Sequence, residues 1–380
     1  MSVRLTPYAT AGRWCSDIRM GTSEKADIGG WRKIVELGSG RTGNVALCIE
    51  PISSSAPNEE RTCGEHRVFQ AVKRVRRQCV KNNGAIRQVL QEKKALQDLR
   101  GHHGIVDLRY TSKDDEHLYF VLEPLLGGPL HRHIRAGPRG HLEVPAAVFY
   151  ASEITSAIAH MHSHGFVHRD LKASNIVFSA SGHVKIVDLG CSKQLERQSG
   201  GCNDGDVGAT GDFSFQKTYT YCGTPHSMAP EMVSREGHGM AVDWWALGIL
   251  VHEMVNGEPP FGFGGDDLTE RITAGFPRDS PPRPGEREHE GCRNVDEPKV
   301  LPIVRRLLDT DPQQRLGSSR DAEEVMSHEW FADVDWERTT KLENEPPAFR
   351  KDLGELEYLD AEHTSTSATD VDPDGLFAGF

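Results

Sequence analysis

The sequence of 380 residues lacks the features of several specialised protein classes. Its eight cysteines include no Cys-x-x-Cys pair, so neither a zinc knuckle nor a dithiol redox motif is indicated, and reduced thiols are expected. No apolar stretch approaches the roughly 20 residues of a membrane span, and residues 1–20 contain no signal-peptide core. Ser2 follows Met1, which gives no myristoylation signal. The sequence therefore predicts a soluble intracellular protein of the cytoplasm or nucleus.

An excess of basic residues is also missing. The chain has 44 Lys and Arg against 56 Asp and Glu, and its formal net charge is −12. A surface that coats nucleic acid needs a broad positive excess, so no nucleic-acid partner is expected. Hydrophobic residues make up 37% and charged residues 26%, which is typical of a soluble globular protein with a large core.

The pattern along the chain changes after its first third. Residues 1–30 are polar and predict an N-terminal extension, and the chain turns acidic from about residue 332. Short apolar runs predict strands at 34–37, 45–49, 68–75 and 118–122, whereas helical spacing predicts helices over 85–99, 144–162 and 242–255. Two polar interruptions, 196–217 and 278–297, predict long mobile loops. A strand-rich region followed by a helix-rich one indicates two lobes of different class.

A glycine-rich turn follows the first predicted strand. Gly38, Ser39, Gly40, Gly43 and Val45 match the pattern Gly-x-Gly-x-x-Gly-x-Val. Glycines let a backbone approach phosphates closely and donate N–H groups to them. A plain hairpin turn is the alternative, and a dinucleotide-binding turn would be followed by a helix. Because a strand follows here, the pattern favours a flap over nucleotide phosphates.

Two charged residues lie in the elements after this turn. Lys73 belongs to an apolar strand and Glu92 to the next predicted helix. An inward-pointing ammonium can pair with α- and β-phosphates, and a carboxylate can hold that ammonium in place. The alternatives are an edge-strand lysine and a solvated helix-face carboxylate, so neither residue is decisive alone.

The centre of the chain carries the strongest pattern. The run His168-Arg169-Asp170-Leu171-Lys172-Ala173-Ser174-Asn175 is followed by Asp188-Leu189-Gly190. These segments resemble the catalytic loop and the metal-binding loop of eukaryotic protein kinases. Further segments fit the same family in the same order: Thr224-Pro225, Ala229-Pro230-Glu231, Asp243-Trp244-Trp245-Ala246-Leu247-Gly248 and Arg315.

The resemblance covers residues 31–331 and implies a fold. This is the α+β, bilobal protein kinase fold, with a small β-rich N-lobe over about 31–122 that has one main helix. A larger, mostly helical C-lobe would span about 123–331. Residues 332–380 would form a C-terminal tail of the kind found in the AGC group.

The resemblance also implies the chemistry, which is transfer of the γ-phosphate of ATP to Ser or Thr hydroxyls of proteins. Asp170 would orient the acceptor hydroxyl, and Lys172 would neutralise the moving phosphate. Asn175 and Asp188 would hold Mg²⁺. Lys73, held by Glu92, would anchor the phosphates. The remaining expected ATP-binding residues are Leu37, Gly38, Ser39, Gly40, Gly43, Val45, Ala71, Leu122, Glu123 and Leu125.

Several segments resemble the AGC group, and within it the cAMP/cGMP-dependent kinases. They are Tyr221-Cys222-Gly223-Thr224-Pro225, Val242–Gly248 and the Glu329-Trp330-Phe331 junction. The terminal Phe377 and Phe380 are expected to dock in an apolar groove of the small lobe. Thr220 aligns with the group's activation-loop phosphosite, where a phosphate would lie close to Arg169 and Lys193. Protein substrates, an upstream activating kinase and an inhibitory regulatory subunit are the implied partners.

Substrate selection departs from this pattern. Pro129 and Ser174 replace glutamates that read substrate arginine in the cAMP-dependent enzymes, and His226 replaces a third acidic residue. Glu253 remains as a predicted substrate-binding residue, together with Thr224. Preference for arginine upstream of the target hydroxyl is therefore a weak hypothesis.

Other hypotheses compete with a protein kinase. A pseudokinase would be an interaction module without Lys73, Asp170, Asn175 or Asp188, yet all four are present. A small-molecule kinase is disfavoured by Thr224-Pro225 and Ala229-Pro230-Glu231, which shape a platform for protein substrates. The clustered histidines at 160, 162, 164 and 168 suggest zinc, but no carboxylate or thiol completes a ligand set. Cys222 is a candidate reactive thiol, with a passive thiol as the default.

Overall fold

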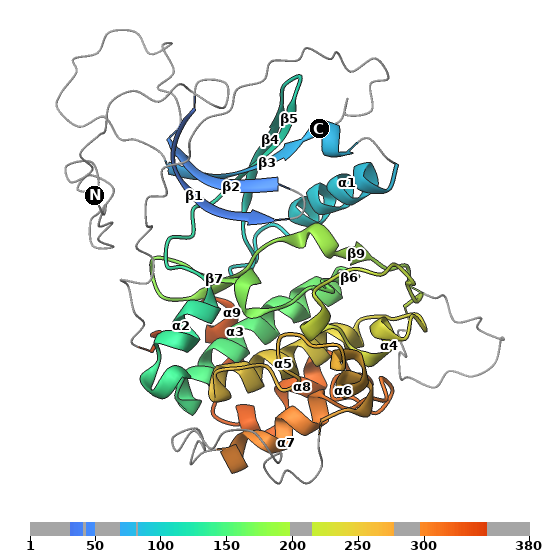
Figure 1. The fold of residues 1–380 in the computed structure, drawn as a ribbon. Coiled ribbons are helices and arrows are strands. Elements are labelled where there is room, and N and C mark those ends of the chain that lie inside the picture. Colours follow the sequence, from blue (N-terminus) through green and yellow to red (C-terminus); the bar gives the residue numbers. More distant parts are fainter. Residues whose placement is uncertain are drawn as a thin grey trace, which may run out of the picture. The chain divides into compact units, whose positions relative to one another are not determined.

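The computed structural model describes residues 31–40, 43–49, 69–80, 83–197, 215–276 and 297–347. These residues divide into two compact units, the first made of 31–100 and 106–128 and the second of 101–105 and 129–347. The first contains a β-sheet and a long helix, and the second is mostly helical (Figure 1). The predicted α+β class, with its β-rich first part and helical second part, is confirmed.

The sheet of the first unit has five antiparallel strands in the order β1-β2-β3-β5-β4. Strands β3 and β5 are buried along most of their length. The strand β4 had not been predicted, because only its first residue is buried and the others, mostly polar, are exposed or half-buried. The bounds are β1 Arg32–Gly40, β2 Gly43–Ile49, β3 Phe69–Arg76, β4 Leu108–Lys113 and β5 His117–Leu122.

Strand register divides the side chains of this sheet between two faces. Val45 pairs with Lys73, and Ala71 pairs with Leu122. Because directly paired residues share a face and faces alternate along a strand, these four side chains lie on one face. The opposite face carries a compact apolar cluster of Trp31, Ala46, Cys48, Val72, Tyr119 and Val121.

The long helix of the first unit, α1 (Asn83–Asp98), lies beside the sheet (Figure 1). It was predicted over 85–99, and its buried residues Ile86, Val89 and Leu96 have the spacing of one helical face. Glu92 is buried on the same helix. The amphipathic pattern thus sets which carboxylate points inward.

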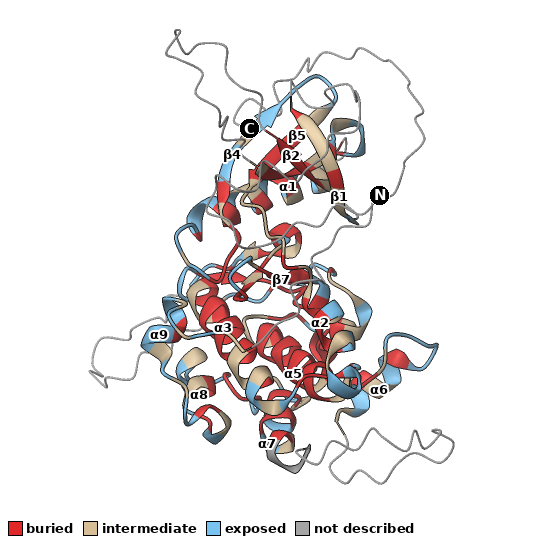
Figure 2. Cartoon of the chain, turned by 90° about the vertical axis from the view of Figure 1, so that its left-hand side faces the viewer, coloured by how far each residue is buried: buried red, intermediate tan, exposed pale blue. Residues whose placement is uncertain are grey.

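Two helices form the centre of the second unit, α3 (Val144–Ser163) and α5 (Ala241–Asn256), and they pack against each other. Both are coloured as buried along most of their length (Figure 2). Trp244 and Trp245 of α5 are fully buried. A helix that is apolar all round belongs in a core rather than on a surface, so the two charged residues of α5 that are also buried, Asp243 and Glu253, stand out.

The other elements of the second unit are short. Two small antiparallel two-stranded sheets pair β6 with β9 and β7 with β8. The helix α9, just after the predicted kinase segment, packs on α3. The bounds are α2 Leu130–Ala136, β6 Phe166–Val167, β7 Ile176–Phe178, β8 Val184–Ile186, β9 Lys193–Gln194, α4 Pro230–Val233, α6 Leu268–Ala274, α7 Glu297–Leu307, α8 Ala322–Met326 and α9 Trp336–Thr340.

Several predicted features lie outside the described residues. These are the extension 1–30, most of the two loops 196–217 and 278–297, and the tail beyond 347 with Phe377 and Phe380. Among the helices in the described part of the chain, none combines the length and the apolar character needed to cross a bilayer.

Candidate active site

In the first unit, Lys73 and Glu92 form a buried ion pair. The Nζ of Lys73 lies 2.6 Å from Oε1 of Glu92, and both side chains are almost fully buried. The lysine comes from the central strand β3, and the glutamate comes from the inward face of α1. A buried charge is costly unless it is paired, so each side chain holds the other in position.

The glycine-rich segment spans the end of β1 and the start of β2. Gly40 pairs with Gly43 across the hairpin, and Gly38 pairs with Val45. A Cβ on Gly43 would lie 2.1 Å from the carbonyl oxygen of Arg74, so close approach to β3 requires glycine there. Gly38, by contrast, is exposed and has open space around it. Of the three glycines, Gly43 is therefore needed for packing, and Gly38 leaves an accessible backbone.

The segment after β5 begins with a reciprocal contact. The amide of Glu123 donates to the carbonyl of Asp107 over 3.0 Å, and Oε1 of Glu123 accepts from the amide of Asp107 over 2.8 Å. The carboxylate of Glu123 thus binds backbone within its own unit. Leu37, Leu122 and Leu125 are partly exposed, and Ala71 is buried.

In the second unit, Asp170 is surrounded by hydrogen-bond donors. Its Oδ1 accepts from Oγ1 of Thr224 at 2.6 Å, and its Oδ2 accepts from Nζ of Lys172 at 2.9 Å. The Nδ2 of Asn175 donates to the carbonyl of Asp170 over 2.9 Å. Lys172 also donates to Oγ1 of Thr224 over 2.6 Å, so a hydroxyl bridges the ammonium and the carboxylate.

Asn175 and Asp188 present oxygen atoms from neighbouring backbone segments. The amide of Val187 donates to the carbonyl of Asn175 over 2.9 Å, which links the two segments. Asp188 is exposed and has left-handed backbone angles, φ 58° and ψ 70°. Because Nδ2 of Asn175 is bound to Asp170, its Oδ1 remains for a ligand. Amide and carboxylate oxygens are the donors that Mg²⁺ prefers.

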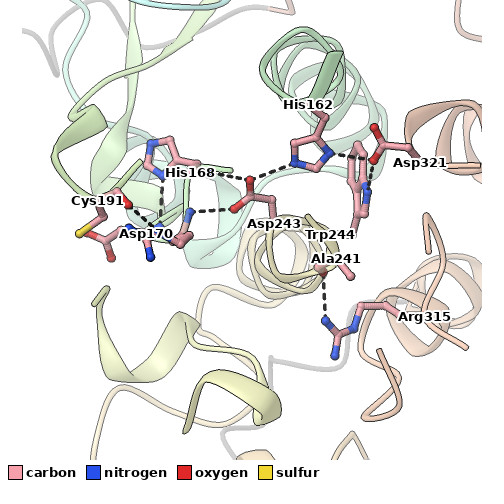
Figure 3. Close-up of polar contacts among 10 residues, drawn as sticks. His162, His168, Asp170, Cys191, Ala241, Asp243, Trp244, Arg315 and Asp321 are labelled. Atoms are coloured by element: carbon pink, nitrogen blue, oxygen red, sulfur yellow. Dashed lines mark hydrogen bonds and ion pairs between the residues drawn. The ribbon is translucent and has the colours of Figure 1, made fainter. Parts of the chain in front are cut away.

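The backbone of the catalytic-loop segment is held by Asp243 of α5 (Figure 3). Its carboxylate accepts from the amide of His168 at 2.7 Å and from the amide of Arg169 at 2.8 Å. Arg169 has φ 69°, a strained value for a residue with a side chain. Burial alone would raise the pKa of Asp243, but the hydrogen bond and charge of His162 hold the pKa below its usual value.

The predicted phosphosite Thr220 is exposed and is linked through Thr218 to Lys193, which in turn lies near Arg169. Lys193 donates to Oγ1 of Thr218 over 2.8 Å, and that oxygen is 3.5 Å from Oγ1 of Thr220. Among the described residues, Nη1 of Arg169 is buried and has no hydrogen-bond partner. Burial and then the charge of Arg169 lower the pKa of Lys193. This local repulsion between cations is what a phosphate would relieve.

The residues predicted to select substrates carry little negative charge. Glu253 is buried, and burial raises its pKa to about 7 against the opposing effect of Arg135. His226 contacts the exposed Phe263 edge-on, and burial followed by the charge of Lys172 lowers its pKa. Ser174 is exposed and uncharged.

Sequence analysis missed several residues that support this site. His162 binds both Asp321 and Asp243, and Arg315 makes a two-pronged ion pair with Glu231. Arg315 and Glu231 stand in segments that the sequence analysis named, but their pairing was not predicted. Asp321 lies in no recognised motif, and no signal in the sequence points to it.

The suggested zinc cluster is not assembled. His162 binds two aspartates, whereas His160 stacks on His102 with ring centres 4.6 Å apart. Within the described residues, no group of three or more His, Cys, Asp or Glu could hold a metal ion.

The candidate reactive thiol, Cys222, is buried beside Cys191. The hydrogen bond between the two thiols raises the pKa of Cys191, and burial raises it further. A raised pKa disfavours the reactive thiolate at Cys191.

Comparisons with known proteins agree with this geometry. The protein kinase domain family matches residues 31–331. A "cAMP-dependent protein kinase, catalytic subunit-like" protein of Caenorhabditis elegans is 33% identical over 331 residues, covering 86% of this chain and 70% of the relative. The "cAMP-dependent protein kinase catalytic subunit PRKX" of Mus musculus is 34% identical over 296 residues, covering 75% and 72%. The "RAC-beta serine/threonine-protein kinase B" of Xenopus laevis is 33% identical over 345 residues, covering 89% and 61%.

The chain therefore belongs to the protein kinase family, and within it to the AGC type of serine/threonine kinase. The predicted family, fold and enzyme class are confirmed, and nothing in these relatives favours the pseudokinase alternative. A protein kinase domain implies the use of ATP, typically with Mg²⁺, and protein substrates.

Proposed function

We propose that this chain transfers the γ-phosphate of ATP to Ser or Thr hydroxyls of proteins, with Asp170 as the group that orients the acceptor hydroxyl. The observation that carries the proposal is the contact of the Thr224 hydroxyl with both Asp170 and Lys172. An acceptor hydroxyl needs the same two partners, a carboxylate for its proton and a cation beside the moving phosphate.

Lys172 would balance the negative charge of the transferring group. Its ammonium is 2.9 Å from Asp170 and only partly buried, so it can turn between that carboxylate and a phosphate. The Lys73–Glu92 pair would bind the α- and β-phosphates of the same nucleotide. In the buried pair, Glu92 fixes the position of the ammonium, which would supply positive charge without reorganisation during the reaction.

The proposed nucleotide site also uses one face of the sheet. Val45, Ala71 and Leu122 share the face of Lys73, which suits an apolar contact with the adenine ring. Leu37, Gly38, Ser39, Gly40 and Gly43 would form the flap over the phosphates. Glu123 and Leu125 would offer backbone groups to the adenine edge.

Asn175 and Asp188 are the proposed Mg²⁺ ligands. Both offer oxygen atoms on linked segments, and Nδ2 of Asn175 is occupied by Asp170, which orients its oxygen. Bound Mg²⁺ would neutralise phosphate charge. Two protein ligands suit this ion, which usually keeps several waters and uses substrate phosphates for the remainder.

Partners beyond the substrate are part of the proposal. The cations near Thr220 support activation by phosphorylation there, which requires an upstream kinase or self-phosphorylation. An inhibitory regulatory subunit is proposed by analogy with relatives named cAMP-dependent catalytic subunits. The cytoplasmic or nuclear location stays a prediction.

The test is phosphorylation of a degenerate Ser/Thr peptide library by the purified full chain with ATP and Mg²⁺, compared with Asp170→Ala. We expect peptide-dependent phosphate transfer in the wild type and its loss in the variant. Binding of ATP without any transfer in both proteins would instead support a pseudokinase. Transfer to small molecules but not to peptides would support the other alternative.

A further inference from the structure

A chain of charged side chains leads from the partly exposed Asp321 through the buried His162 and Asp243 to the catalytic-loop segment (Figure 3). His162 lies between two aspartates, with Nδ1 2.7 Å from Oδ1 of Asp321 and Nε2 3.0 Å from Oδ2 of Asp243. The same carboxylate of Asp243 accepts from the amides of His168 and Arg169. Asp321 is thus connected through two side chains to the backbone that immediately precedes Asp170.

The carboxylate of Asp321 binds His162 instead of capping its own helix. It occupies the N-cap position of α8, where an aspartate ordinarily bonds to the first amides of the helix. Here it makes no such bond, and its Oδ1 accepts from His162 and from Nε1 of Trp244 at 2.8 Å. Its φ of 50° and ψ of −131° are strained for a residue with a side chain. The strain and the missing cap indicate that the carboxylate is directed to His162.

The two aspartates determine the charge of His162. Burial alone would lower its pKa, but the charge of Asp321, the hydrogen bonds to both aspartates and the charge of Asp243 raise the pKa to about 9. Only the imidazolium can donate from both ring nitrogens at once. The groups that face it are Asp243 from α5, Asp321 before α8 and the uncharged ring of Trp244.

We propose that Asp321 is a positioning residue for phosphoryl transfer: it keeps His162 doubly protonated, and His162 through Asp243 holds the strained backbone of His168 and Arg169 that presents Asp170. This inference rests on the proposed kinase function. The link joins residues far apart in the sequence, because Asp321 lies beyond α7 and His162 near the end of α3. It assigns to Asp321 an effect on kcat rather than on ATP binding, because the groups proposed to bind the adenine and the α/β-phosphates belong to the other unit.

The direction of the pH dependence follows from the raised pKa. A group whose pKa is raised on folding contributes stability fully below its ordinary pKa, here 6.5, and that contribution is lost as the pH rises through the folded value of about 9. Asp321→Asn removes one negative charge but keeps a hydrogen-bonding side chain of the same shape. We expect His162 then to lose its proton at a lower pH, closer to 6.5.

The experiment is the pH profile of kcat for the wild type and Asp321→Asn, with KM for ATP measured in parallel. The kcat of the wild type should stay constant up to about pH 9 and fall above it. In the variant, the fall of kcat should begin at a lower pH, closer to 6.5. At pH 8 the variant's kcat should fall about tenfold or more, because small displacements of a reacting group are costly. At pH 6 it should approach the wild-type value, with KM for ATP unchanged throughout.

Three further variants separate this role from general stability. Asp335→Asn changes an aspartate at the N-cap of α9 whose carboxylate caps its own helix through the amide of Arg338, so its profile should match the wild type. Trp244→Phe removes the other bond of Asp321 and should leave the fall of kcat at high pH in place. His162→Gln should abolish the fall of kcat near pH 9. The double variant His162→Gln/Asp321→Asn should have the same pH profile as His162→Gln.

A second readout does not depend on activity. In NMR titrations with labelled histidine, His162 should titrate near pH 9 in the wild type and at lower pH in Asp321→Asn, and the amide signals of His168 and Arg169 should follow the same curve. An unshifted titration, or amides that do not follow it, overturns the inference. An inactive wild type with the expected titrations would instead sink the kinase proposal alone. A uniform loss of kcat at every pH would also overturn the inference.

Discussion

The two units hold their key side chains by different means. In the first, Lys73 and Glu92 are two opposite charges buried together, so removing either charge breaks a buried ion pair. In the second, Asp170 accepts from a hydroxyl, an ammonium and an amide, and the backbone just before it, at His168 and Arg169, is fixed by Asp243. In the first unit, the two side chains are held by a single pair of opposite charges. In the second, several hydrogen bonds together hold Asp170. The comparison predicts unequal sensitivity to single substitutions.

The largest effect should come from breaking the buried pair. Glu92→Gln keeps the shape but leaves the ammonium of Lys73 without its carboxylate, and the loss of one partner of a buried pair costs about 3–5 kcal/mol. We expect kcat/KM for ATP to fall on the order of 10²–10³-fold, comparable to the loss of one preorganised electrostatic group. Steady-state kinetics with varied ATP measures this.

A matched control lies on the same helix. Lys94 and Asp98 of α1 form an ion pair that is largely exposed, and exposed pairs contribute only about 0.2–1 kcal/mol. Asp98→Asn should therefore change kcat/KM by less than about fivefold. Equal losses in Asp98→Asn and Glu92→Gln would mean that burial of the pair does not matter.

The second prediction concerns one bond of the distributed set. Thr224→Val removes the hydroxyl that bridges Asp170 and Lys172, while the ammonium and Asn175 still bind the carboxylate. A hydrogen bond to a charged group contributes about 1.5–3 kcal/mol, so kcat should fall roughly 10- to 100-fold, less than for Glu92→Gln. Thr224→Ser should retain most of the activity. A larger loss in Thr224→Val than in Glu92→Gln would reverse the comparison between the units.

The sequence predicted what depends on local pattern. The strand–turn–strand around Gly38, the strand with Lys73 and the helix with Glu92 follow from side-chain periodicity, whereas the proposed catalytic residues rest on short contiguous motifs. Both long helices of the second unit were also found, because their apolar spacing extends over four or more turns.

What the sequence could not predict depends on contacts between distant segments. Asp321 and His162 are far apart in the chain, and neither the strain at Asp321 nor its missing cap leaves a trace in local composition. The burial of Glu253 was likewise hidden, because a carboxylate in an apolar run does not reveal which way it points. Strand β4 escaped prediction since an edge strand with mostly exposed residues has little apolar signal.

The third prediction extends the comparison to the segment that would regulate Asp170. Thr220→Ala removes the proposed phosphate acceptor linked through Thr218 to Lys193, whose neighbour Arg169 has a buried Nη1 without a hydrogen-bond partner among the described residues. We expect activity about tenfold below that of the phosphorylated wild type, because a phosphate would form one to three charge-assisted hydrogen bonds there. Phosphatase treatment should lower wild-type activity and leave Thr220→Ala unchanged. Tyr219→Phe, at an exposed neighbour, should behave like the wild type, and mass spectrometry should locate the phosphate on Thr220.

The smallest effect is expected for substrate selection by Glu253, because the charge of its carboxyl group depends on pH. Because burial raises the pKa of Glu253 to about 7, this carboxyl is mostly neutral at pH 6 and mostly charged at pH 8. A peptide with arginine upstream of its target hydroxyl should therefore gain over its alanine counterpart as the pH rises. We expect a gain of less than about fivefold, the size of a weak ion pair. Arg135→Ala should move this transition to higher pH, since Arg135 opposes the rise in pKa. Glu253→Gln should abolish it, and a strong arginine preference that persists in Glu253→Gln at pH 6 would show that another group reads the peptide.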